Sequence, residues 1–259
     1  MNDRRGRRTA LIADASAGIG AIYAHRLARR GFRLALAGSC TRGLGRFARW
    51  LRAYGASVET LALDASEGRV AERIADRIAR DRDIAFVVNN SAGADLRSFP
   101  FEPDDHVEAM MALNGAPAAR LAYAAAAALA ARGGGTIVNV AAGSLAGPDR
   151  FDLVGQRPET FLAALSRLIE LELGDSGVRA QAVIPAAGAS MLWAMAEGPV
   201  ERLPRELAGM AEAIVDDALA GLDEGDLVTR LTLRAFDGLL AERLRNPCRI
   251  EPSRLPRAA

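Results

Sequence analysis

A glycine-rich turn near the start of the chain has the residue types and spacing of a ligand site. Residues 9–13 read TALIA, an apolar run typical of a buried strand, and Gly18, Ile19 and Gly20 open the helical pattern that follows. Such a turn lets backbone N–H groups and a helix N-terminus meet a pyrophosphate, which indicates a dinucleotide site. Glycines at this spacing also let a helix pack closely on a strand without any ligand, so both interpretations stay open.

The residue types in the chain restrict the catalysis open to it. Lysine and arginine together number 33, and all 33 are arginines, so no lysine ammonium can take part in any reaction. The tyrosines Tyr23, Tyr54 and Tyr123 all lie in the first half of the chain. Five polar residues lie close together further along the chain: Ser144, Asp149, Arg150, Asp152 and Gln156. They could form a new acid/base set or a solvated loop. The sequence favours the loop, because a general base needs an environment that tunes its pKa and the sequence shows none.

The net charge and the number of cysteines limit the partners and metal sites that the chain can have. The formal charge of +1 argues against a nucleic-acid or anionic-membrane surface that depends on bulk electrostatics. Cys40 and Cys248 lack metal-ligand spacing and are too few for a disulfide framework, so we expect no metal and a reducing cytoplasm. His25 and His106 are expected to be packed or solvated. The apolar stretch 121–131 is too short to span a bilayer, so we expect small molecules or proteins as partners.

Short apolar runs alternate with longer helical patterns along the chain. This alternation predicts an α/β fold, a doubly wound parallel sheet of Rossmann type in a single domain of residues 1–259, with irregular tails at 1–8 and about 247–259. The predicted strands are 9–13, 33–38, 57–63, 84–89, 135–141 and 178–184, with a last candidate at 226–233. The predicted helices are 18–30, 42–54, 67–81, 105–132 and 158–173, with a late helix ahead of the last strand.

A series of further motifs resembles the short-chain dehydrogenase/reductase family, in the family's own order from residue 9 to about 240. The glycine-rich turn resembles its Thr-Gly-x-x-x-Gly-x-Gly fingerprint, and GTIVNVAA resembles the strand that leads to the catalytic serine. Through this resemblance, Asp64 in LALDAS corresponds to a residue near the adenine of NAD or NADP. Asn90 and Gly93 in VVNNSAG match the Asn-Asn-Ala-Gly strand end, and Asn114 in ALNGAP matches the family's helix asparagine.

The chain departs from the family pattern at positions that bind the cofactor. Asp14 replaces the first fingerprint glycine and adds bulk and negative charge where the family receives phosphates. Ser39 stands where an acid or an arginine selects between NAD and NADP, and Ser91 replaces the second asparagine of the strand end. We therefore expect the chain to bind neither cofactor.

The catalytic positions depart further. Aligned with the family's Val-Tyr-x-x-x-Lys-x-Phe-Leu, the stretch VGQRPETFL places Gly155 at the tyrosine and Glu159 at the lysine, while Ala142 stands at the serine. No shift of alignment restores the pair, because no tyrosine follows Tyr123 and the chain has no lysine. Glu159 has a structural explanation as well, since it follows Pro158 in a first helical turn, where a carboxylate meets the helix dipole favourably.

Two interpretations follow. The preferred one is a degenerate family member that has lost the chemistry and assembles, as the family does, through helices 105–132 and 158–173, with an active homologue or with itself. The alternative is an enzyme: an NAD- or NADP-dependent oxidoreductase with an unorthodox site, or a cofactor-independent lyase or isomerase. Apolar residues beyond those that one helix face needs favour assembly: Val107, Met110, Met111, Leu121, Phe161, Leu162, Leu165, Leu168 and Ile169.

Overall fold

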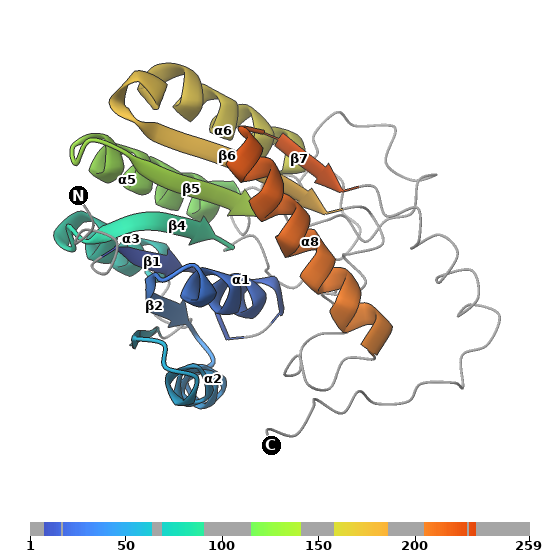
Figure 1. Cartoon of the computed structure of the whole chain (residues 1–259). Helices are drawn as coiled ribbons and strands as arrows, with labels where there is room; N and C mark the ends of the chain where they lie inside the picture. Colours follow the sequence, from blue (N-terminus) through green and yellow to red (C-terminus); the bar gives the residue numbers. More distant parts are fainter. Residues whose placement is uncertain are drawn as a thin grey trace, which may run out of the picture.

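A parallel sheet forms the centre of the molecule in the computed structural model. The structure describes residues 8–16, 18–63, 69–90, 115–140, 158–185, 205–226 and 228–231. Within them a seven-stranded sheet has the order β3-β2-β1-β4-β5-β6-β7, and every neighbouring pair is parallel (Figure 1). The strands are β1 (Thr9–Ile12), β2 (Arg33–Gly38), β3 (Val58–Ala62), β4 (Ile84–Asn89), β5 (Gly135–Val140), β6 (Val178–Pro185) and β7 (Val228–Leu231).

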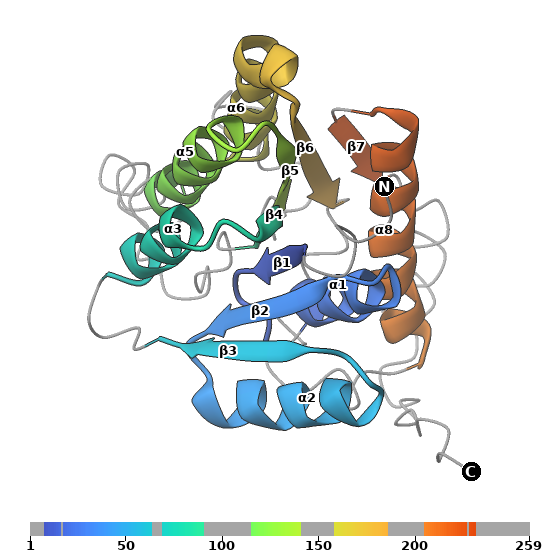
Figure 2. The same cartoon turned by 60° about the vertical axis from the view of Figure 1, so that its left-hand side comes forward.

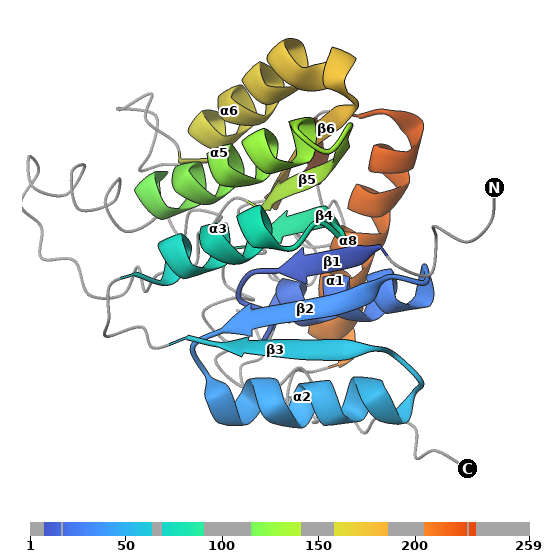
Figure 3. The same cartoon turned by 90° about the vertical axis from the view of Figure 1, so that its left-hand side faces the viewer.

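Helices cover both faces of this sheet. The described helices are α1 (Gly18–Arg29), α2 (Thr41–Ala53), α3 (Val70–Arg80), α5 (Ala116–Ala130), α6 (Pro158–Leu173) and α8 (Arg205–Glu224), and a short 3-10 turn, η5 (Gly174–Ser176), follows α6. Figures 2 and 3 show α3, α5 and α6 side by side on one face, and α1, α2 and α8 on the other. The predicted doubly wound α/β fold is confirmed.

The alternation of side chains along β1 explains the two layers. Ala10 and Ile12 point into a core shared with α1, α2 and α8, whereas Leu11 and Ala13 point into a second core shared with α3, α5 and α6. Since both faces are covered, the central strands are apolar at most positions, which is why they appear in the sequence as mainly apolar runs. β3 lies at one edge of the described sheet, and Glu59 and Thr60 on it are exposed.

The predicted elements agree with the observed ones to within a few residues. The last candidate strand exists as β7, paired in parallel with β6. Helix 105–132 is described only as α5, since residues 105–114 lie outside the described part, as do the predicted tails except for Arg8. In the described part, no helix is both long and apolar enough to cross a membrane.

Candidate functional site

The predicted ligand turn connects β1 to α1 where the strand order reverses. The backbone N–H of Ala13 donates to the Val88 carbonyl of β4 (2.9 Å), and that of Ala15 donates to the Ala37 carbonyl of β2 (2.9 Å). The turn is thus tied to both neighbours of β1. This is the switch point of a doubly wound sheet, where ligands of such folds bind beyond the carboxyl ends of the strands.

Asp14 keeps the backbone shape that glycine would give this turn. Its φ is +50°, in the left-handed region, and it is the one non-glycine residue with a positive φ in the described residues. Aspartate tolerates this conformation better than most residues because its short side chain can form local hydrogen bonds. The Ser16 hydroxyl donates such a bond to the Asp14 carboxylate (Oγ to Oδ1, 3.4 Å). The replacement of glycine therefore changes the charge of the turn more than its path.

The carboxyl group of Asp14 lies in an unfavourable setting for a charge. Although the residue as a whole is exposed, the protein packed around its carboxyl group raises its pKa, and the Ser16 hydrogen bond opposes that rise. No arginine of the described part forms an ion pair with Asp14. A phosphate brought to this turn would meet an uncompensated negative charge.

Gly20 has a packing role that needs no ligand. A Cβ on Gly20 would overlap the Asp14 carbonyl oxygen and lie 3.2 Å from the Cα of Ala15. Gly18 starts α1 with a φ of +56°, and Gly18, Ile19 and Gly20 are all buried. The close approach of α1 to the turn therefore requires glycine at position 20 whether or not a dinucleotide binds.

The other predicted cofactor residues gather only in part. Asn90, half-buried after β4, directs its side-chain N–H to the Asp14 carbonyl at 3.4 Å, so it joins the turn. Ser39 follows β2 and is exposed; the preceding Gly38 lies beside Ser16. Asp64 and Gly93 lie outside the described residues. In the described part no group of three or more His, Cys, Asp or Glu residues could hold a metal ion.

Most predicted catalytic positions also fall outside the described residues. These are Asn114, Ala142, Gly155, and the alternative set Ser144, Asp149, Arg150, Asp152 and Gln156. Glu159 is the second residue of α6, as its position after Pro158 predicts, but its side chain is not described. The described elements that border these positions are the end of β5 at Val140 and the start of α6 at Pro158.

A buried polar chain near these positions was missed by the sequence analysis. The Asn89 amide on β4 donates to the Ala118 carbonyl (2.8 Å) and to Asn139 Oδ1 on β5 (2.9 Å), and Asn139 Nδ2 donates to Ser166 Oγ on α6 (2.9 Å). The side chains of this Asn89–Asn139–Ser166 chain are fully buried. A signal existed, because an asparagine among apolar residues in a buried strand demands a partner.

The comparisons with known proteins decide the family. The model for short chain dehydrogenases matches residues 8–197. This chain belongs to the short-chain dehydrogenase family. Within the family it is similar to the "Inactive hydroxysteroid dehydrogenase-like protein 1" of Rattus norvegicus and of Mus musculus. It is 31% identical to each over 183 residues, 69% of this chain and 55% of each relative, so it spans about half their length.

Solved structures of short-chain dehydrogenases have a similar fold. A short-chain dehydrogenase from Sphingobium yanoikuyae, in complex with NADPH, is 30% identical with a TM-score of 0.69 over 97% of this chain and 99% of that one. The bulky-bulky ketone specific alcohol dehydrogenase from Comamonas testosteroni is 28% identical with a TM-score of 0.68 over 96% of this chain and 98% of that one. The family accounts for the sheet order and for the position of the turn.

Proposed function

We propose that this chain is a catalytically inactive member of the short-chain dehydrogenase family that works in the cytoplasm as a subunit beside an intact homologue. The observation that carries the proposal is the absence of the acid/base pair: no lysine occurs in the chain and no tyrosine follows Tyr123. Without a positioned acid, hydride transfer to a carbonyl loses a contribution of about two to four orders of magnitude in rate. The names of the rat and mouse relatives, which include the word inactive, support this view.

The same proposal predicts that the isolated chain binds neither NAD nor NADP. The Asp14 carboxylate adds a like charge to the phosphate position, and Ser39 offers no charged group to select a cofactor. Calorimetric titration of the wild type with both cofactors should give no binding heat, and micromolar binding of either would contradict the proposal. An Asp14→Asn variant tests the cause, because asparagine also tolerates the left-handed backbone. It should bind better than an Asp175→Asn control on η5.

An exposed apolar face on α5 and α6 supports the subunit role. Tyr123 on α5 is 57% exposed, and Leu168 and Leu171 on α6 are 45% and 72% exposed. These helices lie side by side (Figure 3). Four residues that led the sequence analysis to expect a second apolar face are instead buried in this chain's own core: Leu121, Leu162, Leu165 and Ile169. The outer face therefore consists of fewer residues than the sequence suggested, and it is most exposed at Leu171.

Coexpression with an intact homologue tests the role. The partner is a family member with both tyrosine and lysine, taken from the same genome, and affinity purification uses a tag on this chain alone. We expect a mixed species with turnover that depends on the partner's tyrosine. The variant Leu168→Glu/Leu171→Glu should lose the mixed species and keep its far-ultraviolet circular dichroism, whereas Ala79→Glu, at an exposed site on α3, should retain it. Recovery of separate homo-oligomers alone would refute the role.

A second candidate is an enzyme of the same family with an unorthodox site, or a cofactor-independent lyase or isomerase that uses the family's substrate position. The retained shape of the turn at Asp14 and Gly18, together with the NADPH-bound relative, favours the oxidoreductase form. Turnover of a ketone with NADPH that disappears in Ser144→Ala or Asp152→Asn would support it. Absence of turnover in the wild type, with the partner also absent, would leave the subunit role as the remaining proposal.

A further inference from the structure

The outer face of α2 carries a stripe of aromatic rings. Phe47 and Trp50 are stacked, with ring centroids 5.9 Å apart and an interplanar angle of 14°, and Trp50 contacts Tyr54 at 4.6 Å. His25 of α1 lies against the same indole at 5.5 Å. Trp50 is 38% and Tyr54 65% exposed, so large apolar rings meet solvent here. Because the ring contacts already fix their orientation, a partner that covers them would lose little side-chain entropy.

Next to the rings lie arginines that have no acidic partner within the described part of the chain. Residues 39–57 contain Arg42, Arg46, Arg49 and Arg52 and no acidic residue at all. The spacings of four and three residues place the first three on one side of the helix, beside the aromatic stripe. None of the four forms an ion pair within the described part of the chain; Arg49 and Arg52 donate only to the carbonyls of Gly45 and Val58.

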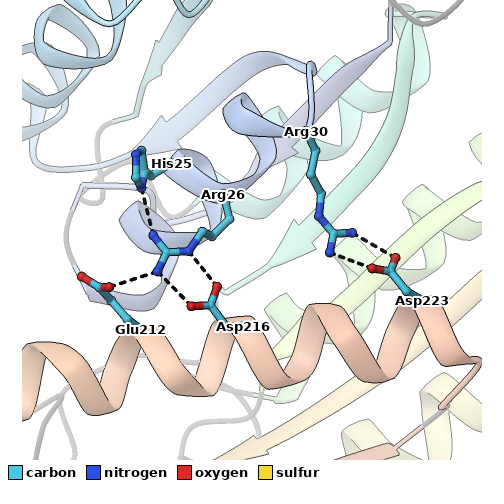
Figure 4. A network of polar contacts seen from close by, with 6 residues as sticks. All are labelled: His25, Arg26, Arg30, Glu212, Asp216 and Asp223. Atoms are coloured by element: carbon cyan, nitrogen blue, oxygen red, sulfur yellow. Dashed lines mark hydrogen bonds and ion pairs between the residues drawn. The ribbon is translucent and has the colours of Figure 1, made fainter.

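The arginines of the neighbouring helix α1 show what pairing looks like in this molecule. Arg26 holds Asp216 of α8 with two bonds, Nε to Oδ1 at 2.7 Å and Nη2 to Oδ2 at 2.9 Å, and also reaches Glu212 at 3.0 Å. Arg30 likewise donates two hydrogen bonds to the Asp223 carboxylate, from Nη1 at 3.0 Å and from Nη2 at 2.8 Å (Figure 4). The acidic groups that face α1 are thus already paired with α1. The four arginines of α2 take no part in these ion pairs with α8, so their positive charge is available to another group.

We propose that the outer face of α2, with Arg46, Arg49, Trp50 and Tyr54 at its centre, is a docking surface for an acidic segment of a partner protein. Tryptophan, tyrosine and arginine are the residue types that dominate binding energy at protein–protein contacts, and this face combines all three. Positive charge that has no ion pair among the described residues selects an acidic partner. The surface lies on the opposite side of the sheet from α5 and α6, so the proposal stands apart from the proposed function (Figure 2).

Neither end of the chain offers a matching occupant. Residues 232–259 contain six arginines and three acidic residues, and MNDRRGRR at the other end is basic too, so either end would repel α2. A second copy would have to bring the acidic side of α8, where, among residues 211–224 whose side chains are described, only Asp217 and Glu224 remain without an ion pair in the described part.

The test uses the purified full chain and a fluorescein-labelled random copolymer of glutamate and tyrosine as an acidic, aromatic protein-like probe. Fluorescence anisotropy is measured at low and at raised salt. We expect binding that weakens as salt rises. The variant Arg46→Gln/Arg49→Gln should bind about tenfold more weakly and with less salt dependence, and Trp50→Ala and Tyr54→Ser should each weaken binding about tenfold at constant salt.

Controls separate this surface from general charge effects. The variant Arg80→Gln/Arg120→Gln removes the same charge from α3 and α5 and should bind the copolymer as the wild type does. Tyr54→Ser covers the case in which Trp50→Ala fails to fold, because Tyr54 lies at the end of the helix and is the more exposed ring. The proposal is overturned by no binding at about 100 μM probe, or by equal loss in the control.

Three further outcomes would assign the face to another occupant and overturn the proposal. A single-stranded oligo-dT that binds more tightly than the copolymer, with the same loss in the α2 variants, would make it a nucleic-acid surface. Tighter binding to phosphatidylserine vesicles than to the copolymer would make it a membrane surface. Salt-sensitive self-association in light scattering that Arg46→Gln/Arg49→Gln abolishes would make it a contact between copies.

Discussion

We expect that removal of the buried Tyr23 hydroxyl oxygen stabilises the protein. Its side chain on α1 has 0% exposure, and no group lies within hydrogen-bonding distance of its hydroxyl in the described part of the chain. A buried hydroxyl without a partner costs about 1–3 kcal/mol relative to water. Tyr23→Phe removes that cost and leaves a void of one oxygen, so we expect the free energy of unfolding to rise by about 1 kcal/mol and Tm by about 2–4 °C.

Chemical denaturation followed by circular dichroism measures this change. Tyr123→Phe is the matched control, because the ring of Tyr123 is exposed; its effect should stay within about 0.5 kcal/mol. A loss of about 1 kcal/mol or more in Tyr23→Phe would refute the reasoning, since it would mean that the hydroxyl has a partner that stabilises the fold.

Alkaline titration gives an independent measure at the same residue. Burial raises the pKa of Tyr23 far above its ordinary value of 10.0, with Arg30 opposing the rise. The folded pKa exceeds the unfolded one, so the titration of Tyr23 leaves stability unchanged below about pH 10 and lowers it as pH rises above that value, because the unfolded state then loses the proton first. The wild type should lose stability more steeply above about pH 10 than Tyr23→Phe does. Parallel curves would contradict the burial of this hydroxyl.

Two further predictions concern other buried or partly buried polar groups. Asn139→Leu removes both side-chain hydrogen bonds of Asn139 and should lower the free energy of unfolding by about 2–4 kcal/mol. Ser166→Ala removes one of them and should lower it by about 1 kcal/mol. A denaturant midpoint of Asn139→Leu within experimental error of the wild type would contradict this prediction. Burial, followed by Arg26 and Arg29, lowers the pKa of His25 from 6.5, so its contribution to stability is present above pH 6.5 and is lost as pH falls below that value. His25→Gln should therefore flatten the loss of stability between about pH 7 and about pH 5, and equal slopes in the variant and the wild type would be evidence against this prediction.

The sequence by itself determined the layers and the order of the elements. Mainly apolar runs such as 84–89 and 135–141 indicated strands buried on both faces, because short apolar stretches fit a covered parallel sheet. It also determined that no lysine is available to a site, since residue types are a property of the chain and no fold can supply an absent lysine. The turn at Gly18 to Gly20 was located correctly for the same local reason: glycine permits close backbone approach.

Tertiary structure alone decided which residues meet. The Asn89–Asn139–Ser166 chain joins residues 27 and 50 positions apart, and local patterns carry no information about such partners. The outward apolar face of α5 and α6 proved smaller than the sequence suggested, because Leu165 and Ile169 are used by the sheet, a choice set by how the helix is rotated on its neighbours. In the same way, Arg26 and Arg42 are alike in sequence, yet only the packing of α8 against α1 gives Arg26 its acidic partners and leaves Arg42 with none in the described chain. Charge neutralisation is thus a property of the assembled surface, since it depends on distances between helices that the sequence does not state.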